Sequence, residues 1–348
     1  MPASIRITLP GVVRLGFGLS FLLAILLSSA CDQPDSYLFT GPTMGTVYNV
    51  KVVPVPAQSQ REQLAVGIQG TVDRINLLMS TYRDDSELSR FNRSSPGSWF
   101  ELSAETAEVI SLGLTISELT AGSFDMTVGP LVNLWGFGPQ TGRDSIPSEA
   151  DIRAALQLVG YRNIVMRATL PSAVRKSENV YVDLSAIAKG YAVDKVAQFL
   201  EAKGVVNYLV EIGGELKARG RKQNGALWQV AIESPGVAGR ESHRVLPLAN
   251  ISVATSGDYW NYFEVEGVRY SHTIDPTTGR PVTHNVASVT VLDSSTARAD
   301  ALATAFNVMG TKAGLALANE HNLAVLFIEK GENGFRERSS AAFAPHLQ

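Results

Sequence analysis

Two hard oxygen donors, Asp300 and Thr304, lie four residues apart in a segment, 296–308, whose apolar spacing is helical. Because positions four apart share one face of a helix, the carboxylate and the hydroxyl would point in the same direction. Mg²⁺ prefers oxygen ligands and keeps room for water and phosphate oxygens, so the pair is a candidate magnesium site. A structural alternative stays open, in which Asp300 interacts with the helix dipole and Thr304 bonds its own backbone.

A candidate general base is His272, in a segment where a short strand runs into a turn rich in Pro and Gly. Such a turn fixes the direction of nearby side chains. A histidine held there can accept a proton near neutral pH. The same ring could instead bond a backbone carbonyl in a structural role. None of the five histidines is paired with another at helical metal-ligand spacing.

Two further segments suggest an anion site. Thr255, Ser256 and Gly257 offer small side chains and N–H groups that can cradle a phosphate, although an ordinary turn has the same composition. Lys189 falls in the first turn of a predicted helix, where the helix dipole disfavours a cation unless it meets an anion. This local conflict points to function, and a solvated surface lysine is the alternative.

Aromatic residues and glycines are interleaved between residues 122 and 138, for example at Phe124, Trp135 and Phe137. Glycine beside an aromatic surface allows the close approach of a flat ring. Core packing is the alternative interpretation.

Several common chemistries are excluded by absent motifs. The chain has no G-x-x-x-x-G-K-[ST], G-x-G-x-x-G, H-E-x-x-H or G-x-S-x-G. Its single cysteine, Cys31, excludes an internal disulfide and a cysteine-based metal site. The net charge of −3 gives no reason to expect nucleic acid binding.

The elements that must position these residues mix helices and strands without strict βαβ alternation, which favours an α+β fold. We expect a single large catalytic domain, with two interlocked subdomains as a variant. Helices are predicted at 58–81, from Ser103 to Leu119, at 147–160, at 188–202 and at 296–308, with Gly310 at the end of the last. Strands are predicted at 46–53, 179–183, 205–212 and 323–329, the last being the final core strand, and the stretch 227–290 is rich in strand patterns.

The N-terminus predicts export. Arg6 and Arg14 precede an uncharged run that ends in small residues and then Cys31, the layout of a signal peptide followed by a lipidated cysteine. We therefore divide the chain into a signal peptide (1–30), a lipidated tether (31–39) and a catalytic domain (40–348). An uncleaved anchor helix is the alternative. In either case the domain would face away from the cytoplasm.

Together these segments resemble the ApbE family, the FAD:protein FMN transferases. The similarity spans about Thr40 to Gly310, and eight motifs in the same order are not expected by chance. The matching segments are 43–46 with Tyr48, 79–82 with Ser86-Glu87, 124–131, Lys189-Gly190-Tyr191, Gly213-Gly214, 254–257, 272–279 and 299–304.

The resemblance implies an Mg²⁺-dependent enzyme that cleaves the pyrophosphate of FAD, releases AMP, and links FMN by a phosphoester to a Thr or Ser of another protein. Mg²⁺ would be held by Asp300, Thr304 and the backbone carbonyl of Ala186. Some relatives have a further Asp where this chain has Ala303, so more water or phosphate oxygens are expected around the ion. The FAD site implied by the resemblance comprises Met44, Tyr82, Ser123, Phe124, Asp125, Asp183, Lys189 and Ile274.

The partners implied by the resemblance are flavin-acceptor subunits of membrane redox complexes, such as the sodium-pumping quinone reductase and its Rnf relatives. Asp32, directly after Cys31, resembles an inner-membrane retention signal of bacterial lipoproteins. We therefore expect a lipid-anchored protein on the periplasmic side of the inner membrane. Two alternatives to the transferase are an FAD pyrophosphatase, in which water replaces the protein hydroxyl, and a flavin-binding lipoprotein without catalysis.

Overall fold

The computed structural model describes residues 36–138, 146–167, 172–235, 242–257, 262–265, 268–332 and 334–347, which belong to one unit, Asp35–Gln348. Cys31, the predicted signal peptide and most of the predicted tether lie outside the described residues. Within the described part of the chain, no helix combines the length and the apolar character needed to cross a bilayer.

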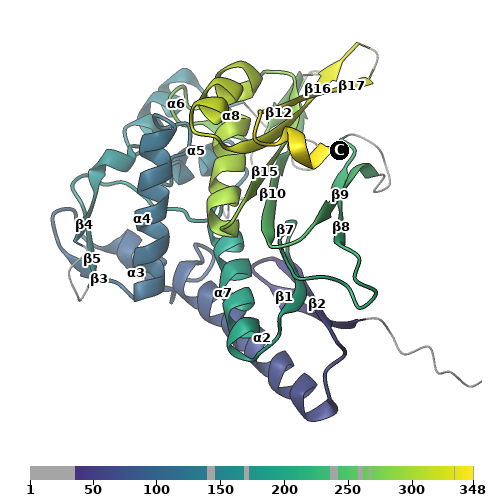
Figure 1. Ribbon diagram of the computed structural model, residues 1–348. Helices are drawn as coiled ribbons and strands as arrows, with labels where there is room; N and C mark the ends of the chain where they lie inside the picture. The colour runs from purple at the N-terminus through teal and green to yellow at the C-terminus, as the bar shows by residue number, and fades with distance from the viewer. Residues whose placement is uncertain are drawn as a thin grey trace, which may run out of the picture. The chain divides into compact units, whose positions relative to one another are not determined.

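An eight-stranded sheet, antiparallel at every pair, forms the framework of this unit (Figure 1). In spatial order its strands are β1 (Tyr37–Thr43), β2 (Thr46–Val53), β6 (Asn207–Ile212), β7 (Glu215–Arg219), β10 (Ile251–Gly257), β15 (Val286–Asp293), β16 (Ala324–Gly331) and β17 (Gly334–Ser339). The interior strand β15 is buried at every position except its last, which requires cover on both faces of the sheet.

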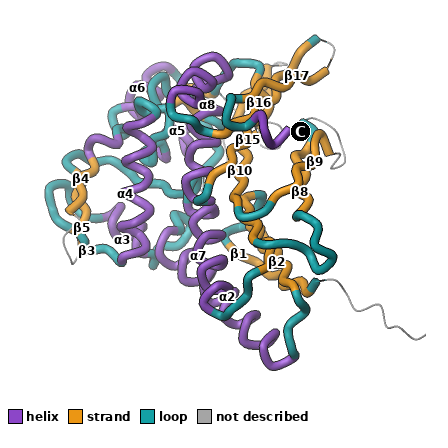
Figure 2. The backbone as a smooth tube through the Cα atoms, viewed as in Figure 1, coloured by secondary structure: helices purple, strands orange, loops and turns teal. Residues whose placement is uncertain are grey.

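Helices cover one of these faces, as the separation of helix and strand in Figure 2 shows. They are α2 (Gln58–Met79), α7 (Ala188–Ala202) and α8 (Thr296–Glu320), and α4 (Ala104–Leu119) packs on α2 and α8. α8 lies against β10 and β15, and α7 lies against β6 and β7. The two helices also touch each other closely, because a Cβ on Gly190 of α7 would come within 2.4 Å of the Thr296 carbonyl oxygen. Their contact is therefore possible only with glycine at this position.

The opposite face is covered by a separate hairpin, β8 (Trp228–Glu233) with β9 (Ser242–Leu248), and by the 3₁₀ helix η2 (Ala344–Leu347). Trp228, Val253 and Phe343 belong to the apolar cluster on this side. The hairpin thus gives the sheet a second hydrophobic layer.

A third, smaller cluster holds the segment that carries His272. It joins Leu131 of α5 (Gly129–Leu134), Ile152 of α6 (Glu149–Leu156) and Ile274 of β13 (Ile274–Asp275). Trp135 Nε1 donates to the Gly279 carbonyl oxygen at 2.8 Å, which ties α5 to the hairpin of β13 and β14 (Arg280–Pro281). The remaining elements are α3 (Glu87–Arg93), β3 (Phe100–Glu101), β4 (Ile164–Arg167), β5 (Ala173–Lys176), the 3₁₀ helix η1 (Tyr161–Asn163), β11 (Tyr262–Val265) and β12 (Val268–Ser271).

The α+β class is confirmed, and the long periodic segments are where the sequence predicts them. α2 and α7 match the predicted helices, and α4 begins after Ser103, whose side chain accepts from the Thr106 N–H. β2 and β6 match predicted strands.

Four predictions about elements are wrong in part. Residues 179–183 form no strand; instead both backbone groups of Val182 bond the Asn92 side chain at 2.8 Å, and the strand of this region is β5. The helix predicted to reach residue 160 ends at Leu156. The predicted end of the 296–308 helix at Gly310 (φ 69°) is confirmed, although a second helical stretch that was not predicted continues to Glu320.

The remaining two corrections concern the ends of the domain. β16 is not the final strand, because β17 pairs with it along the edge of the sheet. The tether predicted for residues 31–39 ends earlier than expected, because Tyr37 already pairs with Val52 in β1. Phe39, within that strand, is 6% exposed, so the sheet begins inside the segment assigned to the tether.

Candidate active site

One cavity of about 880 Å³ gathers nearly all the residues singled out from the sequence. Its wall comes from β2, the β6–β7 turn, α7, α8, the end of β10 and the segment before β13. The predicted residues that line it are Tyr82, Ser123, Phe124, Asp125, Asp183, Ala186, Lys189, Thr255, Ser256, Gly257, His272, Ile274, Asp300 and Thr304.

Met44 is the exception among the described candidates. It occupies the tight turn between β1 and β2 at φ 47°, followed by Gly45 at φ 75°, and its side chain packs against the main core. The cavity wall includes its neighbour Thr46 instead. The structure thus brings the turn, but not the Met44 side chain, to the cavity.

The metal candidates depend on the start of α8. The Ser295 side chain caps this helix, and Asp194 of α7 accepts hydrogen bonds from the Ala297 N–H (3.1 Å) and the Thr296 hydroxyl (3.0 Å). Asp300 follows one turn later and accepts from the Gly190 N–H at 3.1 Å. The α7–α8 contact therefore fixes where the Asp300 carboxylate lies, and Thr304 follows on the same helix face.

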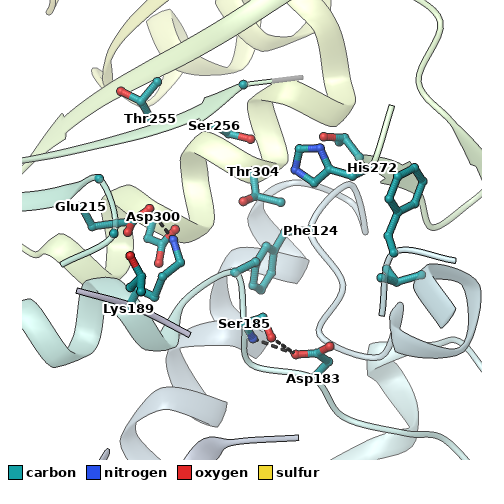
Figure 3. Close-up of a pocket in the computed structure, with 18 of the residues that line it drawn as sticks. Phe124, Asp183, Ser185, Lys189, Glu215, Thr255, Ser256, His272, Asp300 and Thr304 are labelled. Carbon is teal, nitrogen blue, oxygen red and sulfur yellow. Dashed lines mark hydrogen bonds and ion pairs between the residues drawn. The ribbon is translucent and has the colours of Figure 1, made fainter. Parts of the chain in front are cut away.

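Beside Asp300, the half-buried Lys189 and the buried Glu215 form an ion pair with 2.6 Å between Nζ and Oε1 (Figure 3). Burial, and then the nearby Asp300 charge, raises the pKa of Glu215 to about 8. Burial also raises the pKa of Asp300. Burial acts to lower the pKa of Lys189, but the two carboxylates outweigh it and raise this pKa. We call these three residues the acidic cluster.

The acidic cluster suits a divalent cation. It holds two carboxylates but one ammonium, and Glu215 Oε2 is buried with no hydrogen-bond partner among the described residues. Buried carboxylates without full pairing are unfavourable, so the cluster is electrostatically incomplete. In the described part of the chain, no three His, Cys, Asp or Glu side chains come together as a metal site. An ion here would therefore also rely on hydroxyl, carbonyl and ligand oxygens.

The predicted phosphate segment is a strand end, not a turn. Thr255, Ser256 and Gly257 pair with β15 on one side, while on the other side β7 pairs with β10 only as far as Val253. Beyond Val253, the backbone of β10 has no strand neighbour on the β7 side within the described sheet. Backbone groups on this side can therefore face the cavity, as a phosphate cradle requires.

Asp125 lines the cavity, but its carboxylate is already occupied. Oδ1 accepts from the N–H (2.7 Å) and the hydroxyl (2.6 Å) of Thr127, and Oδ2 accepts from the Tyr161 N–H (2.9 Å). Burial raises its pKa against these bonds. Its geometry is that of a residue that holds a loop in place, with Phe124 beside it in the cavity wall.

The remaining candidates complete two other parts of the wall. Asp183 Oδ1 accepts from the N–H (2.8 Å) and the hydroxyl (2.5 Å) of Ser185. Tyr82 is 71% exposed, and partial desolvation, followed by the Asp183 charge, raises its pKa. His272 is half-buried, with its ring centroid 6.2 Å from that of Phe137 in an edge arrangement.

Sequence reasoning missed two residues of this site, Glu215 and Asn307. Glu215 follows Gly213-Gly214, so the glycine pair was the available signal. Its pairing with Lys189, 26 positions earlier, has no local signature. Asn307 continues the face of Asp300 and Thr304 by one turn, and that periodicity could have indicated it.

The fold and the cavity define an α+β protein whose acidic cluster, open strand end and aromatic wall suit a ligand with phosphates and a flat ring. Comparison with known proteins agrees. The family model described as "ApbE family" matches residues 44–327. The chain therefore belongs to the ApbE family.

Relatives in this family are similar over nearly the whole chain. The FAD:protein FMN transferase of Vibrio cholerae is 44% identical, over 94% of this chain and 97% of its own length. That of Haemophilus influenzae is 41% identical, over 92% and 95%. Among solved structures, the flavin transferase ApbE from Vibrio cholerae has a TM-score of 0.83 at 43% identity, covering 90% of this chain and 99% of that chain. The apo flavinyl transferase ApbE from Pseudomonas stutzeri has a TM-score of 0.81 at 42% identity, covering 90% and 96%.

Proposed function

We propose that this protein is an Mg²⁺-dependent FAD:protein FMN transferase. The observation that carries the proposal is that the acidic cluster, the open end of β10 and His272 line one shared cavity in a chain of the ApbE family. These are the three parts that phosphoryl transfer needs: charge neutralisation, phosphate positioning and a proton acceptor.

The reaction exchanges the phosphoanhydride bond of FAD for a phosphoester bond to the acceptor protein. The hydroxyl oxygen of an acceptor Thr or Ser attacks the FMN-side phosphorus of FAD, the bond to the bridging oxygen breaks, and AMP leaves with that oxygen. His272 takes the hydroxyl proton, and the N–H groups near Ser256 hold phosphate oxygens. Asp300, Thr304 and the Ala186 carbonyl would hold Mg²⁺, which when bound neutralises the pyrophosphate.

We further propose that the protein is lipid-anchored through Cys31 at the periplasmic side of the inner membrane. The support is the order of charged, apolar and small residues before Cys31, and Asp32 after it. Anchoring would raise the local concentration of the enzyme beside flavin-acceptor subunits of membrane redox complexes, of the sodium-pumping quinone reductase or Rnf type.

One experiment tests the function. The full-length chain in detergent is incubated with FAD, Mg²⁺ and a candidate acceptor subunit, and AMP release and flavin fluorescence on the denatured acceptor are followed. Transfer predicts both products, and a chelator should remove both. AMP and FMN without a fluorescent acceptor would instead identify a pyrophosphatase, and tight FAD binding without either product would identify a flavin carrier.

A separate experiment tests the anchor. Cells that express the wild type or the Cys31→Ser variant are labelled with a radioactive fatty acid and fractionated. We expect label and inner-membrane location for the wild type alone. An unlabelled wild type, or a labelled variant, would contradict the assignment of Cys31.

A further inference from the structure

A fully buried amide, Asn307, connects two parts of the cavity wall that are far apart in the sequence. Its Nδ2 donates to the Ser256 hydroxyl at 3.0 Å and to the Thr273 hydroxyl at 3.2 Å. Ser256 lies in the strand end assigned to phosphate, and Thr273 directly follows the proposed base His272. One side chain thus joins both segments to α8.

Asn307 also shares a helix face with the metal candidates. Asp300, Thr304 and Asn307 are separated by four and three residues, so they lie along one face of α8. The helix breaks three residues later at Gly310, and the Asn307 carbonyl oxygen is bonded by His284 Nε2 at 2.7 Å. The break is therefore capped by a side chain, which holds this turn of the helix in place.

The hydrogen bonding of Asn307 is incomplete in a way that stability does not explain. Its Oδ1 is buried with no hydrogen-bond partner in the described part of the chain. An unpaired buried carbonyl oxygen is destabilising, and an aliphatic side chain of the same size would avoid that penalty. A residue that breaks a local rule for stability is expected at a functional site.

We infer that Asn307 is a positioning residue: it fixes the phosphate-holding end of β10 and the His272 segment at one distance from the metal-binding face of α8. The inference rests on the proposed function and deepens it. In-line attack needs the phosphate and the proton acceptor in one fixed arrangement, and small misplacements slow such reactions strongly. Loss of the amide should therefore lower turnover more than FAD binding.

The test uses the full-length chain in detergent with Mg²⁺ and the acceptor subunit. It measures single-turnover AMP release from FAD, and it measures FAD affinity by flavin fluorescence. Asn307→Leu keeps the volume but removes the donor. We expect AMP release to fall roughly tenfold to a hundredfold, with FAD affinity changed by less than about threefold. In the Ser256→Ala background the same substitution should cause a much smaller further loss, since coupled residues are not additive. Asn307→Ser, which is too short to reach both hydroxyls, is the second variant if the leucine variant does not fold.

The matched control is Ser340→Ala. Ser340 is also buried and joins two segments, donating to the Leu323 carbonyl oxygen (2.7 Å) and accepting from the Val325 N–H (3.0 Å), but it does not line the cavity. This variant should lose stability and keep its rate of AMP release. Wild-type turnover in Asn307→Leu, or an equal loss in both Ser256 backgrounds, would overturn the inference.

Hydrogen exchange separates this inference from the proposed function. In the protein without FAD, Asn307→Leu should expose the amides of 251–257 and 271–275 to faster exchange, and Ser340→Ala should not. If the wild type releases no AMP at all, the proposed function is wrong, and exchange alone decides the role of Asn307. Unchanged exchange in these two segments would then refute it.

Discussion

Two buried acidic regions border the same cavity, and they differ in how completely the protein satisfies them. Asp125 accepts three hydrogen bonds, from Thr127 and Tyr161, so both of its oxygens are occupied. In the acidic cluster, Glu215 Oε2 has no partner among the described residues, and the carboxylates outnumber the ammonium. Burial raises carboxyl pKa values in both regions. Burial of a carboxylate therefore does not indicate function by itself. A buried carboxylate whose hydrogen bonds and charge are incompletely paired does.

The largest effect is expected for Asp300→Ala. If the acidic cluster binds the metal, this variant should release AMP about a thousandfold more slowly, because a main electrostatic stabiliser is lost. The check is AMP release across an Mg²⁺ titration, with Asp125→Asn as the variant from the other region. Full activity of Asp300→Ala without added metal would contradict the metal assignment. It would also contradict the functional difference between the acidic cluster and the Asp125 region.

His272 lies outside both regions, so its replacement should separate chemistry from binding. His272→Ala is expected to bind FAD normally and to turn over about a hundredfold more slowly, since a general base contributes rate and not ground-state affinity. Flavin fluorescence gives the affinity and AMP release gives the rate. Lost FAD binding would make His272 a structural residue.

The acidic cluster should also make stability depend on pH. The pKa of Glu215 is about 8 in the folded protein, against an ordinary value of 4.5, so folding favours the protonated form. The resulting stabilisation is fully present below pH 4.5 and is lost as the pH rises through 8, by on the order of 5 kcal/mol. Urea unfolding of the metal-free protein at several pH values measures this loss.

Two controls sharpen the pH prediction. Mg²⁺ should restore part of the stability above pH 8, because it binds the folded state. Glu215→Gln should flatten the pH dependence between 4.5 and 8. A variant with the same slope as the wild type would show that another group titrates.

The smallest effect belongs to Asp125. Asp125→Asn should lower the free energy of unfolding by about 2 kcal/mol, because one of its three buried partners loses its acceptor. Turnover at saturating FAD should change less than about tenfold. Urea unfolding and AMP release are the two measurements. If Asp125→Asn kept its stability but lost FAD binding, the Asp125 region would be the functional one and not a structural one.

The local parts of this structure follow from local sequence patterns. Apolar residues at helical spacing predict helix α2. The four-residue separation of Asp300 and Thr304 predicts that they share one face of α8. The conflict at Lys189 correctly indicated a nearby anion, and Glu215 supplies it. The resemblance to the ApbE family supplied the remaining candidate residues. Among the described candidates, all except Met44 line the cavity.

The errors share one physical cause, which is that distant partners change the meaning of a local pattern. The extended residues near Val182 bond the Asn92 side chain instead of a strand. β17 was missed because its exposed, charged sequence is that of an edge strand, stabilised by pairing with β16. Neither partner is near in the sequence.

By itself, the sequence determined the long periodic helices, the α+β class and the chemical types available to the site, because these depend on spacing within one or two turns of chain. Only the tertiary structure decided which charges meet and which remain unpaired. Lys189 meets Glu215 across 26 positions, and Asn307 meets Ser256 across 51. Such contacts, together with the burial that raises the pKa of Glu215, arise when the sheet and its helices close around the cavity.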